Sequence, residues 1–307
     1  MHVSSDPYSK TRMMAAFTVG LALLMVVIKT YLYTSTGASS FLASLIDSLT
    51  DLLLSGITWM GVRWASKPAD DNHRYGHGKM EALIGFMQFL IVSAAALTLG
   101  WQAGARLAVP EALNPGWLDI GLTIAILGST LLLVSMQNKV VAETGSLAIR
   151  GDQAHYASDL WGNAALVFLL IINLFGDFSW LDPVFTAVIA VVLLSAAGKI
   201  GRDSMNTLLD HEAPDDTRYQ LLEAALKVGG VSGVHDLRVI ESGLHLRILL
   251  DIEVDGHMLL SEAHDISRRV ESALLSIAPS AEIMIHIDPV GELEDSRHET
   301  LEPHHFS

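Results

Sequence analysis

The sequence predicts a membrane α-helical protein with six transmembrane helices, followed by a C-terminal α+β cytoplasmic domain with the element order αββαβ. Half of the 307 residues are hydrophobic and only 17% are charged, which is unusual for a soluble protein. After residue 205 the long apolar runs end and acidic residues become frequent. A soluble all-α bundle is the alternative, and six long apolar segments argue against it.

Six apolar segments are each long enough, at about 20 residues, to cross the roughly 30 Å hydrocarbon core of a bilayer. The fifth is the least clear, because its first two turns carry Asp152, His155 and Asp159. The first segment is longer than a signal-peptide core and lacks a cleavage-like site, so we keep it as part of the structure. The expected spans are 13–36, 40–65, 80–105, 117–141, 150–175 and 181–200.

The distribution of Lys and Arg predicts the orientation of these spans in the membrane. The connections on one side carry only Arg106, whereas those on the other side carry ten basic residues. Both termini are therefore expected in the cytoplasm. Lys29 lies inside the first span, where we expect it to reach the membrane surface or to pair within the bundle. The ten residues are Lys10, Arg12, Arg63, Lys67, Arg74, Lys79, Lys139, Arg150, Lys199 and Arg202.

Beyond the spans, the hydrophobic pattern predicts a small α+β sandwich with its helices on one face of the sheet. Ser242 and Gly243 separate two strands and predict a hairpin turn. The expected elements are helices at 215–228 and 261–277 and strands at 234–242, 244–254 and 281–288. The expected domains are 1–205 in the membrane and 206–290 in the cytoplasm, followed by a disordered acidic tail at 291–307.

Charge and cysteine content exclude several classes of partner. Residues 212–307 carry 19 Asp or Glu against 7 Lys or Arg, which accounts for most of the net charge of −15. This acidity disfavours nucleic acid and anionic lipid head groups as partners of the cytoplasmic domain. The chain has no cysteine, which excludes disulfides and thiolate ligands and disfavours a copper(I) carrier.

Two pairs of polar residues interrupt the apolar spans. Asp47 and Asp51 lie in the second span, and His155 and Asp159 lie in the fifth. The spacing i, i+4 places both members of each pair on one helix face. A carboxylate at the bilayer centre costs on the order of 3 kcal/mol, so we expect these residues to have a function. Three oxygen ligands and one nitrogen form a tetrahedral set that suits a divalent metal such as zinc.

The depth of the two pairs is consistent with a single site. Asp51 and Asp159 each lie about 11 residues, or roughly 17 Å, from opposite membrane faces. Antiparallel helices then bring the two residues together near the midplane.

Two further groups of histidines and carboxylates lie outside the spans. Asp70, His73 and His77 occupy the loop KPADDNHRYGHGK, where Gly76 and Gly78 allow a tight turn. The spacing of these residues fits a metal site and a solvated polar loop equally well. A third group has His286 and Asp288 on one face of the last strand, because side chains alternate along a strand. The group includes His235, His264, His286 and Asp288. Any one of these histidines alone would be interpreted as a surface residue.

Several motifs together resemble the cation diffusion facilitator family, and within it the bacterial zinc exporters. They are DSLTD, PADDNHRYGHGKMEAL, HYASD, GVHDLR and HIDP, and the resemblance covers roughly residues 10–290. It implies six spans, a metallochaperone-like cytoplasmic domain and a homodimer in the bacterial inner membrane. It also implies zinc export driven by protons that flow inward.

The resemblance also implies roles for individual residues. Asp47, Asp51, His155 and Asp159 match the family's transport site, and Asp70, His73 and His77 match its loop site. The cytoplasmic binuclear site is matched by His235, Asp251, His264, His286 and Asp288, with Asp288 as the bridging carboxylate. Asp251 stands where close relatives have a histidine, which puts metal affinity and preference there in doubt. Lys79 and Asp210 resemble a charge pair between the two domains.

Site chemistry indicates how transport is coupled. Metal binding needs a neutral imidazole and ionised carboxylates, so protons and metal compete for the same atoms. The sequence has no G-x-x-x-x-G-K-[ST] segment, which argues against a nucleotide as energy source. Cadmium and iron(II) are possible additional substrates, and a manganese or iron(II) carrier of the same family is the first alternative. An intramembrane metal-dependent hydrolase is the second, and the H-E-x-x-H motif typical of such enzymes is absent.

Overall fold

The computed structural model describes residues 8–36, 39–108, 117–172 and 180–291. Within these ranges many side chains near the helix ends, and that of Asp47, are outside the described part. The chain forms two compact units, one at Pro7–Leu208 and one that begins at Leu209. Nearly all of the acidic tail predicted at 291–307 lies outside the described residues.

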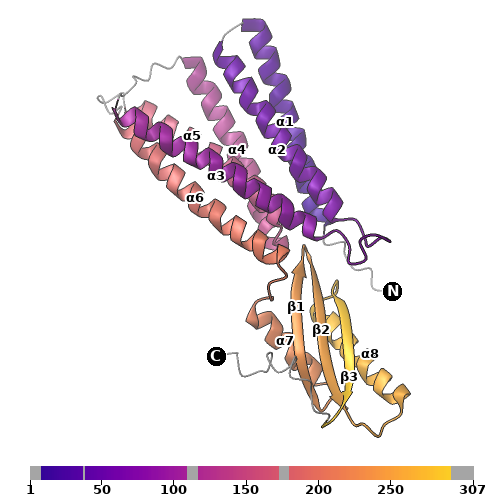
Figure 1. Cartoon of the computed structure of the whole chain (residues 1–307). Helices are drawn as coiled ribbons and strands as arrows, with labels where there is room; N and C mark the ends of the chain where they lie inside the picture. The colour runs from indigo at the N-terminus through magenta and orange to yellow at the C-terminus, as the bar shows by residue number, and fades with distance from the viewer. Residues whose placement is uncertain (1–7, 37–38, 109–116, 173–179, 292–307) are drawn as a thin grey trace. The chain divides into compact units, whose positions relative to one another are not determined.

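The first unit consists of six long helices, shown in Figure 1 from indigo to salmon. Each predicted span coincides with one helix, and most ends agree within four residues. The prediction was wrong at the end of the sixth span, because hydropathy falls after residue 200 while the helix continues for eight residues. The helices are α1 Ser9–Thr36, α2 Ser39–Ala65, α3 Lys79–Ala108, α4 Trp117–Thr144, α5 Leu147–Ile172 and α6 Leu181–Leu208.

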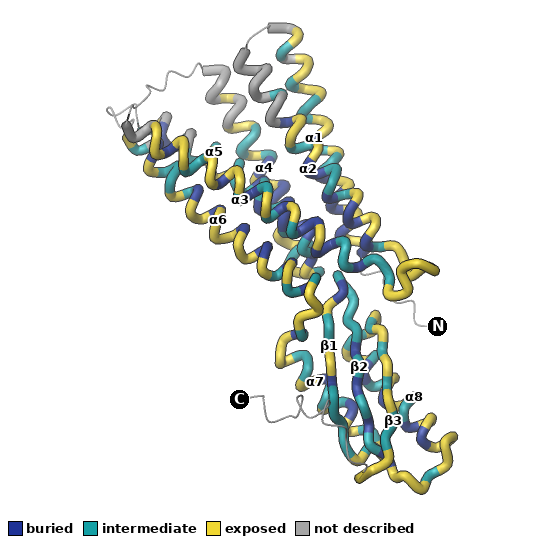
Figure 2. The backbone as a smooth tube through the Cα atoms, in the orientation of Figure 1, coloured by how far each residue is buried: buried dark blue, intermediate teal, exposed yellow. Residues whose placement is uncertain are grey.

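Helix composition separates the six helices into two groups. Among the described residues, α1, α3, α4 and α6 contain stretches that are long and apolar enough to cross a membrane. The other two, α2 and α5, carry the predicted polar pairs. Figure 2 shows exposed residues, in yellow, along the outer sides of the helices. Many of these are large and apolar, including Val27, Leu132 and Val191, which suits contact with lipid rather than water.

The third helix packs closely on α5 and α6 because glycines remove side chains from the contacts. A Cβ atom on Gly151 of α5 would lie 2.6 Å from the Cβ of Gln88 on α3. A Cβ atom on Gly201 of α6 would lie 2.6 Å from the Phe89 ring, also on α3. Small residues allow helix backbones to approach closely in a membrane, where water does not drive association. This packing fixes the depth of α5, which carries His155.

The second unit has the predicted αββαβ order. Strands β1 Gly233–Ser242 and β2 His245–Val254 form an antiparallel hairpin, and β3 Glu282–Pro289 pairs parallel with β2. Gly243 has the positive φ of 67° that the tight turn requires. The helices are α7 Asp215–Leu226 and α8 Leu260–Ile277, and α8 connects the two parallel strands.

A single apolar core joins the sheet to both helices of this unit. Alternate β2 residues Ile248, Leu250 and Ile252 are fully buried against residues such as Leu221 of α7 and Leu274 of α8. Because side chains alternate along a strand, the intervening residues of β2 lie on the opposite, open face. Asp251 is therefore placed on the open face of the sheet.

Replacement of Ile248 by alanine should destabilise the second unit by about 2–5 kcal/mol, because it leaves a cavity in this core. Hydrogen exchange of β2 amides in the purified full chain measures the loss of protection. Met284→Ala is the matched control, since Met284 is 59% exposed on β3, and it should cost no more than about 0.5 kcal/mol. Equal loss of protection in both variants would contradict the assignment of this core.

Candidate metal sites

Three ligand-bearing side chains from two helices meet inside the helical unit. The Nε2 atom of His155 on α5 lies 3.0 Å from Oδ1 of Asp51 on α2 and 4.0 Å from Oδ2 of Asp159. Ligand atoms of the three residues all lie within 4.8 Å of one another, a spacing that one ion can bridge. Asp47 lies one turn from Asp51 on α2, and its side chain is outside the described part of the structure.

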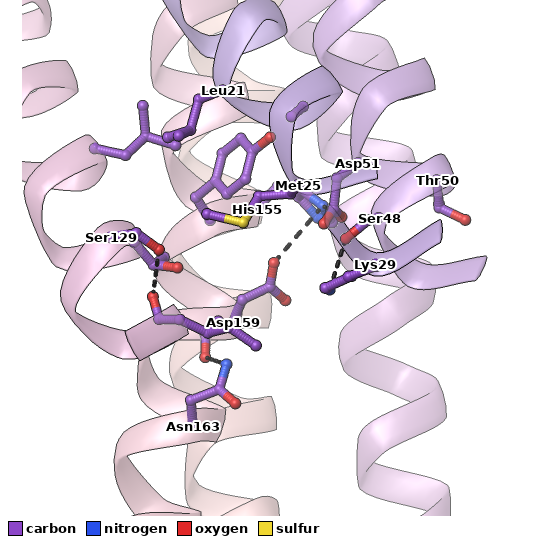
Figure 3. A pocket seen from close by; sticks show the side chains of 15 residues that line it. Leu21, Met25, Lys29, Ser48, Thr50, Asp51, Ser129, His155, Asp159 and Asn163 are labelled. Carbon is purple, nitrogen blue, oxygen red and sulfur yellow. Dashed lines mark hydrogen bonds and ion pairs between the residues drawn. The ribbon is translucent and has the colours of Figure 1, made fainter. Parts of the chain in front are cut away.

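A cavity of about 330 Å³ opens beside these ligands and is lined by α1, α2, α4 and α5. Figure 3 shows Asp51, His155 and Asp159 directed into it, with Met25 of α1 nearby. One water occupies about 30 Å³ in the liquid, so the cavity has room for an ion with part of its hydration shell. At the Asp159 side, the Nδ2 of Asn163 donates a hydrogen bond to the carbonyl oxygen of Asp159 at 2.7 Å.

A buried hydrogen-bonded cluster lies one helical turn away from the ligands. The Asp152 carboxylate of α5 accepts hydrogen bonds from Nε2 of Gln137 on α4, at 2.8 Å, and from the Ser55 hydroxyl of α2, at 3.3 Å. Ser55 Oγ also lies 3.0 Å from the Tyr156 hydroxyl. All four side chains are buried. The cluster holds α2, α4 and α5 together directly beside the site.

In the sequence, Asp152 is apparent only as a charge that makes the fifth span less clear. A signal for the cluster was present, since Asp152 is three residues before His155 and Ser55 is four residues after Asp51. Both residues therefore lie on the same helix faces as the ligands. Pairing the two faces in this register would have predicted the contact.

The loop between α2 and α3 brings Asp70, His73 and His77 together. His73 Nδ1 lies 3.2 Å from Asp70 Oδ1, and His77 Nε2 lies 3.4 Å from Asp70 Oδ2. The backbone N–H of His73 donates to Asp70 Oδ1 at 2.7 Å, and this bond lowers the pKa of the Asp70 carboxyl. Gly76, with φ of 75°, makes the turn that returns His77 toward Asp70.

The open face of the C-terminal sheet carries a third group. His235 lies with its Nδ1 3.9 Å from Asp251 Oδ2 and its Nε2 3.6 Å from Asp288 Oδ2. The strand register explains this, because His235 is opposite Asp251 and Asp251 is opposite His286. His286 Nε2 lies 3.0 Å from Asp288 Oδ1.

Not every residue predicted for the C-terminal domain is part of this group. The triad of His235, Asp251 and Asp288 has ligand atoms within 4.8 Å of one another. His264 is exposed on α8 and belongs to no group of three or more ligands among the described residues. Of the other residues predicted for the binuclear site, His286 lies beside Asp288, and His264 is separate.

A bulge in β1 directs His235 toward Asp251 and Asp288. The register shifts between His235 and Arg238, and Asp236 there has a positive φ of 46°. Its carboxylate accepts two hydrogen bonds from the Arg238 guanidinium, at 2.9 and 2.8 Å, which hold the bulge in place.

The two members of the predicted charge pair belong to different units. Lys79, at the start of α3, donates a hydrogen bond from Nζ to the carbonyl oxygen of Leu208 at 3.3 Å. Asp210 follows α6 with a positive φ of 56°. Their pairing stays a prediction.

Sequence comparison identifies both units. Residues 15–209 match the cation efflux transmembrane domain, and residues 213–290 match the cytoplasmic domain of cation efflux proteins. The chain belongs to the cation efflux family, the cation diffusion facilitators. It is accordingly a membrane transporter rather than an enzyme, and the predicted fold of six helices followed by a small α+β domain is confirmed.

Individual members of the cation efflux family resemble most of the chain. The cation-efflux pump FieF of Yersinia pestis is 39% identical over 284 residues, which cover 92% of this chain and 94% of the relative. FieF of Yersinia pseudotuberculosis has the same identity and coverage.

Two solved structures are similar to about a quarter of the chain. The metal-bound C-terminal domain of the CzcD transporter of Thermotoga maritima is 31% identical, with a TM-score of 0.24, over 26% of this chain and 93% of that chain. The zinc form of CzrB, titled a putative zinc transporter, is 25% identical, with a TM-score of 0.25, over 27% of this chain and 97% of that chain.

Asp251 provides a test of electrostatics in the C-terminal triad. Partial burial raises the pKa of its carboxyl above the ordinary 3.8, and the nearby charge of Asp236 adds to this. Because this pKa is higher in the folded state, ionisation of Asp251 costs folding free energy. The stability of the metal-free C-terminal domain therefore falls as pH rises through the interval above 3.8, and it stays lower at neutral pH.

We therefore expect Asp251→Asn to stabilise the metal-free domain at pH 7, with the gain shrinking as pH falls through that interval. Hydrogen exchange of β2 and β3 amides in the full chain with a chelator measures this change. Asp265→Asn on the exposed surface of α8 is the matched control and should change nothing. Weaker protection in Asp251→Asn at pH 7 would count against this account.

Proposed function

We propose that this transporter exports divalent metal cations from the cytoplasm in exchange for protons, with zinc as the preferred ion. The observation that carries the proposal is the group of Asp51, His155 and Asp159 within apolar helices. Two carboxylates and an imidazole are costly to place there unless a cation or protons compensate them. The similar FieF proteins carry the name of cation-efflux pumps, which supports the same direction of transport.

The ligand types favour zinc over harder ions. The described set supplies two carboxylates and one imidazole, and we propose Asp47 as the fourth ligand of a tetrahedral site. Zinc accepts this mixture of oxygen and nitrogen, and cadmium and iron(II) are further candidates. Manganese is the alternative, because carboxylates outnumber nitrogen and manganese prefers oxygen.

Exchange follows from competition for the same atoms. His155 Nε2 and the two carboxylates bind either protons or a metal ion, so entry of one releases the other. A change in the packing of α2 against α5 would expose the same site to each membrane side in turn. Ser55, Asp152 and Gln137 lie beside the ligands and tie both helices together in the present arrangement.

The remaining groups extend the proposal. Asp70, His73 and His77 are proposed as a cytoplasmic loop site, and His235, Asp251 and Asp288 as one metal site of the C-terminal domain. The second site of the predicted binuclear centre, in which Asp288 bridges to His286 and His264, would require His264 to approach these two residues. We propose a homodimer in the bacterial inner membrane with both termini cytoplasmic. The domain bounds 1–205 and 206–290 and the pairing of Lys79 with Asp210 are kept as parts of this proposal.

Loss of either carboxylate should abolish transport. Asp51→Ala and Asp159→Ala each remove a charged ligand, so zinc uptake by proteoliposomes with a pH gradient should fall to background while the protein stays folded. The matched control is Asp71→Ala, since Asp71 is fully exposed outside the loop group. Parallel measurements with cadmium, iron(II) and manganese determine the preferred ion. Normal flux in either ligand variant would refute the site, and higher flux with manganese would favour the alternative.

Zinc binding should release protons. We expect the binding enthalpy in detergent to depend on the ionisation enthalpy of the buffer, and zinc affinity to fall as pH is lowered, because protons occupy His155 and the carboxylates. Calorimetry in two buffers at one pH counts the protons. His155→Ala should release fewer protons per zinc. A binding enthalpy that is the same in every buffer would contradict proton exchange.

A further inference from the structure

Lys29 of α1 is a positive charge inside the cavity that holds the metal ligands. It lines the same space as Asp51, His155 and Asp159, although its neighbours Ile28 and Tyr31 are exposed on the outside of the helix. Its Nζ donates a hydrogen bond to the hydroxyl of Ser48 at 2.6 Å. The sequence leaves two arrangements for Lys29, at the membrane surface or paired within the bundle. The bond to Ser48 shows the second.

Lys29 is held close to the ligand helix. Ser48 is only 2% exposed and lies three residues before Asp51 on α2, so it is about one helical turn from the first ligand. Figure 3 shows Lys29 beside Ser48, on the side of the cavity where Asp51 lies. A cation there acts on any ion that Asp51 binds.

The cavity walls increase the strength of this interaction. Leu21, Met25, Ile126 and Leu133 line the same space, and apolar walls screen charges less than water does. Without metal, an ammonium group compensates the charges of Asp51 and Asp159, which would otherwise repel each other. With a divalent cation in place, the same ammonium group repels the cation.

From this placement we propose that Lys29 is a built-in counter-cation that competes with the transported metal ion. It stabilises the site between transport events and weakens metal binding, which speeds release. A transporter needs such weakening, because an ion held too tightly does not leave. This inference rests on the proposed function and adds a residue that sets affinity and turnover.

A purely structural role predicts the opposite result. If Lys29 served only to anchor α1 to Ser48, its loss would loosen the site and lower metal affinity. If it acts through its charge, its loss raises affinity. A gain of affinity cannot come from damaged folding, so the sign of the change separates the two roles.

The test uses the full chain with His73→Ala and His235→Ala, which disable the other two groups, and titrates it with zinc alone. We expect Lys29→Gln to bind zinc roughly tenfold more tightly or more. In proteoliposomes it should show a lower KM and a lower maximal rate. Lys29→Arg keeps the charge and should resemble the parent chain. Lys10→Gln removes one positive charge outside the cavity, at the exposed pair with Glu143, and is the matched control.

Each result decides one point. Unchanged or weaker zinc binding in Lys29→Gln would overturn the inference, and so would equal tightening in Lys10→Gln. If the parent chain binds zinc and loses it on Asp51→Ala, the proposed site stands whatever Lys29 does. Failure of the parent chain to bind zinc would instead refute the proposed function.

Discussion

The cost of placing charge within apolar helices is the constraint on which the membrane part depends. Asp51 and Asp159 lie within apolar helices, where lipid cannot solvate a charge, so their helices must bring partners to them. The structure does this by setting α2 against α5, where His155 contacts both carboxylates. The neighbouring helices α1 and α4 then supply the other walls of the cavity.

Close packing of α5 and α6 on α3 supports this arrangement. Gly151 allows α5 to approach Gln88 of α3, and Gly201 allows α6 to approach Phe89. Contacts that involve no charge thus help to fix the position of His155. Polar groups face the cavity, small residues face the neighbouring helices, and large apolar residues face outward.

Much of this could be predicted from sequence, because each signal was local. Hydropathy located the six helices, and the i, i+4 spacing placed Asp51, His155 and Asp159 on facing surfaces. Alternation along strands placed Asp288 and His286 on one side of the sheet. Features that depend on how distant elements pack could not be predicted from such local signals. The contact between Asp152 and Gln137 depends on how α4 meets α5, and the separation of His264 depends on how α8 lies on the sheet. The end of α6 was missed because helix formation continues where hydropathy fades.

The polar contact between α2 and α5 has a mechanical consequence. These two helices meet beside the cavity through Asp51 and His155 and, one turn away, through Ser55 and Asp152. Two helices that meet through apolar side chains have one preferred spacing. Where they meet through carboxylates and an imidazole, the spacing depends on whether a cation lies between these groups. Under the proposed exchange, the bound ion would therefore help to set the spacing between α2 and α5. That spacing would differ between the metal-bound and the protonated site.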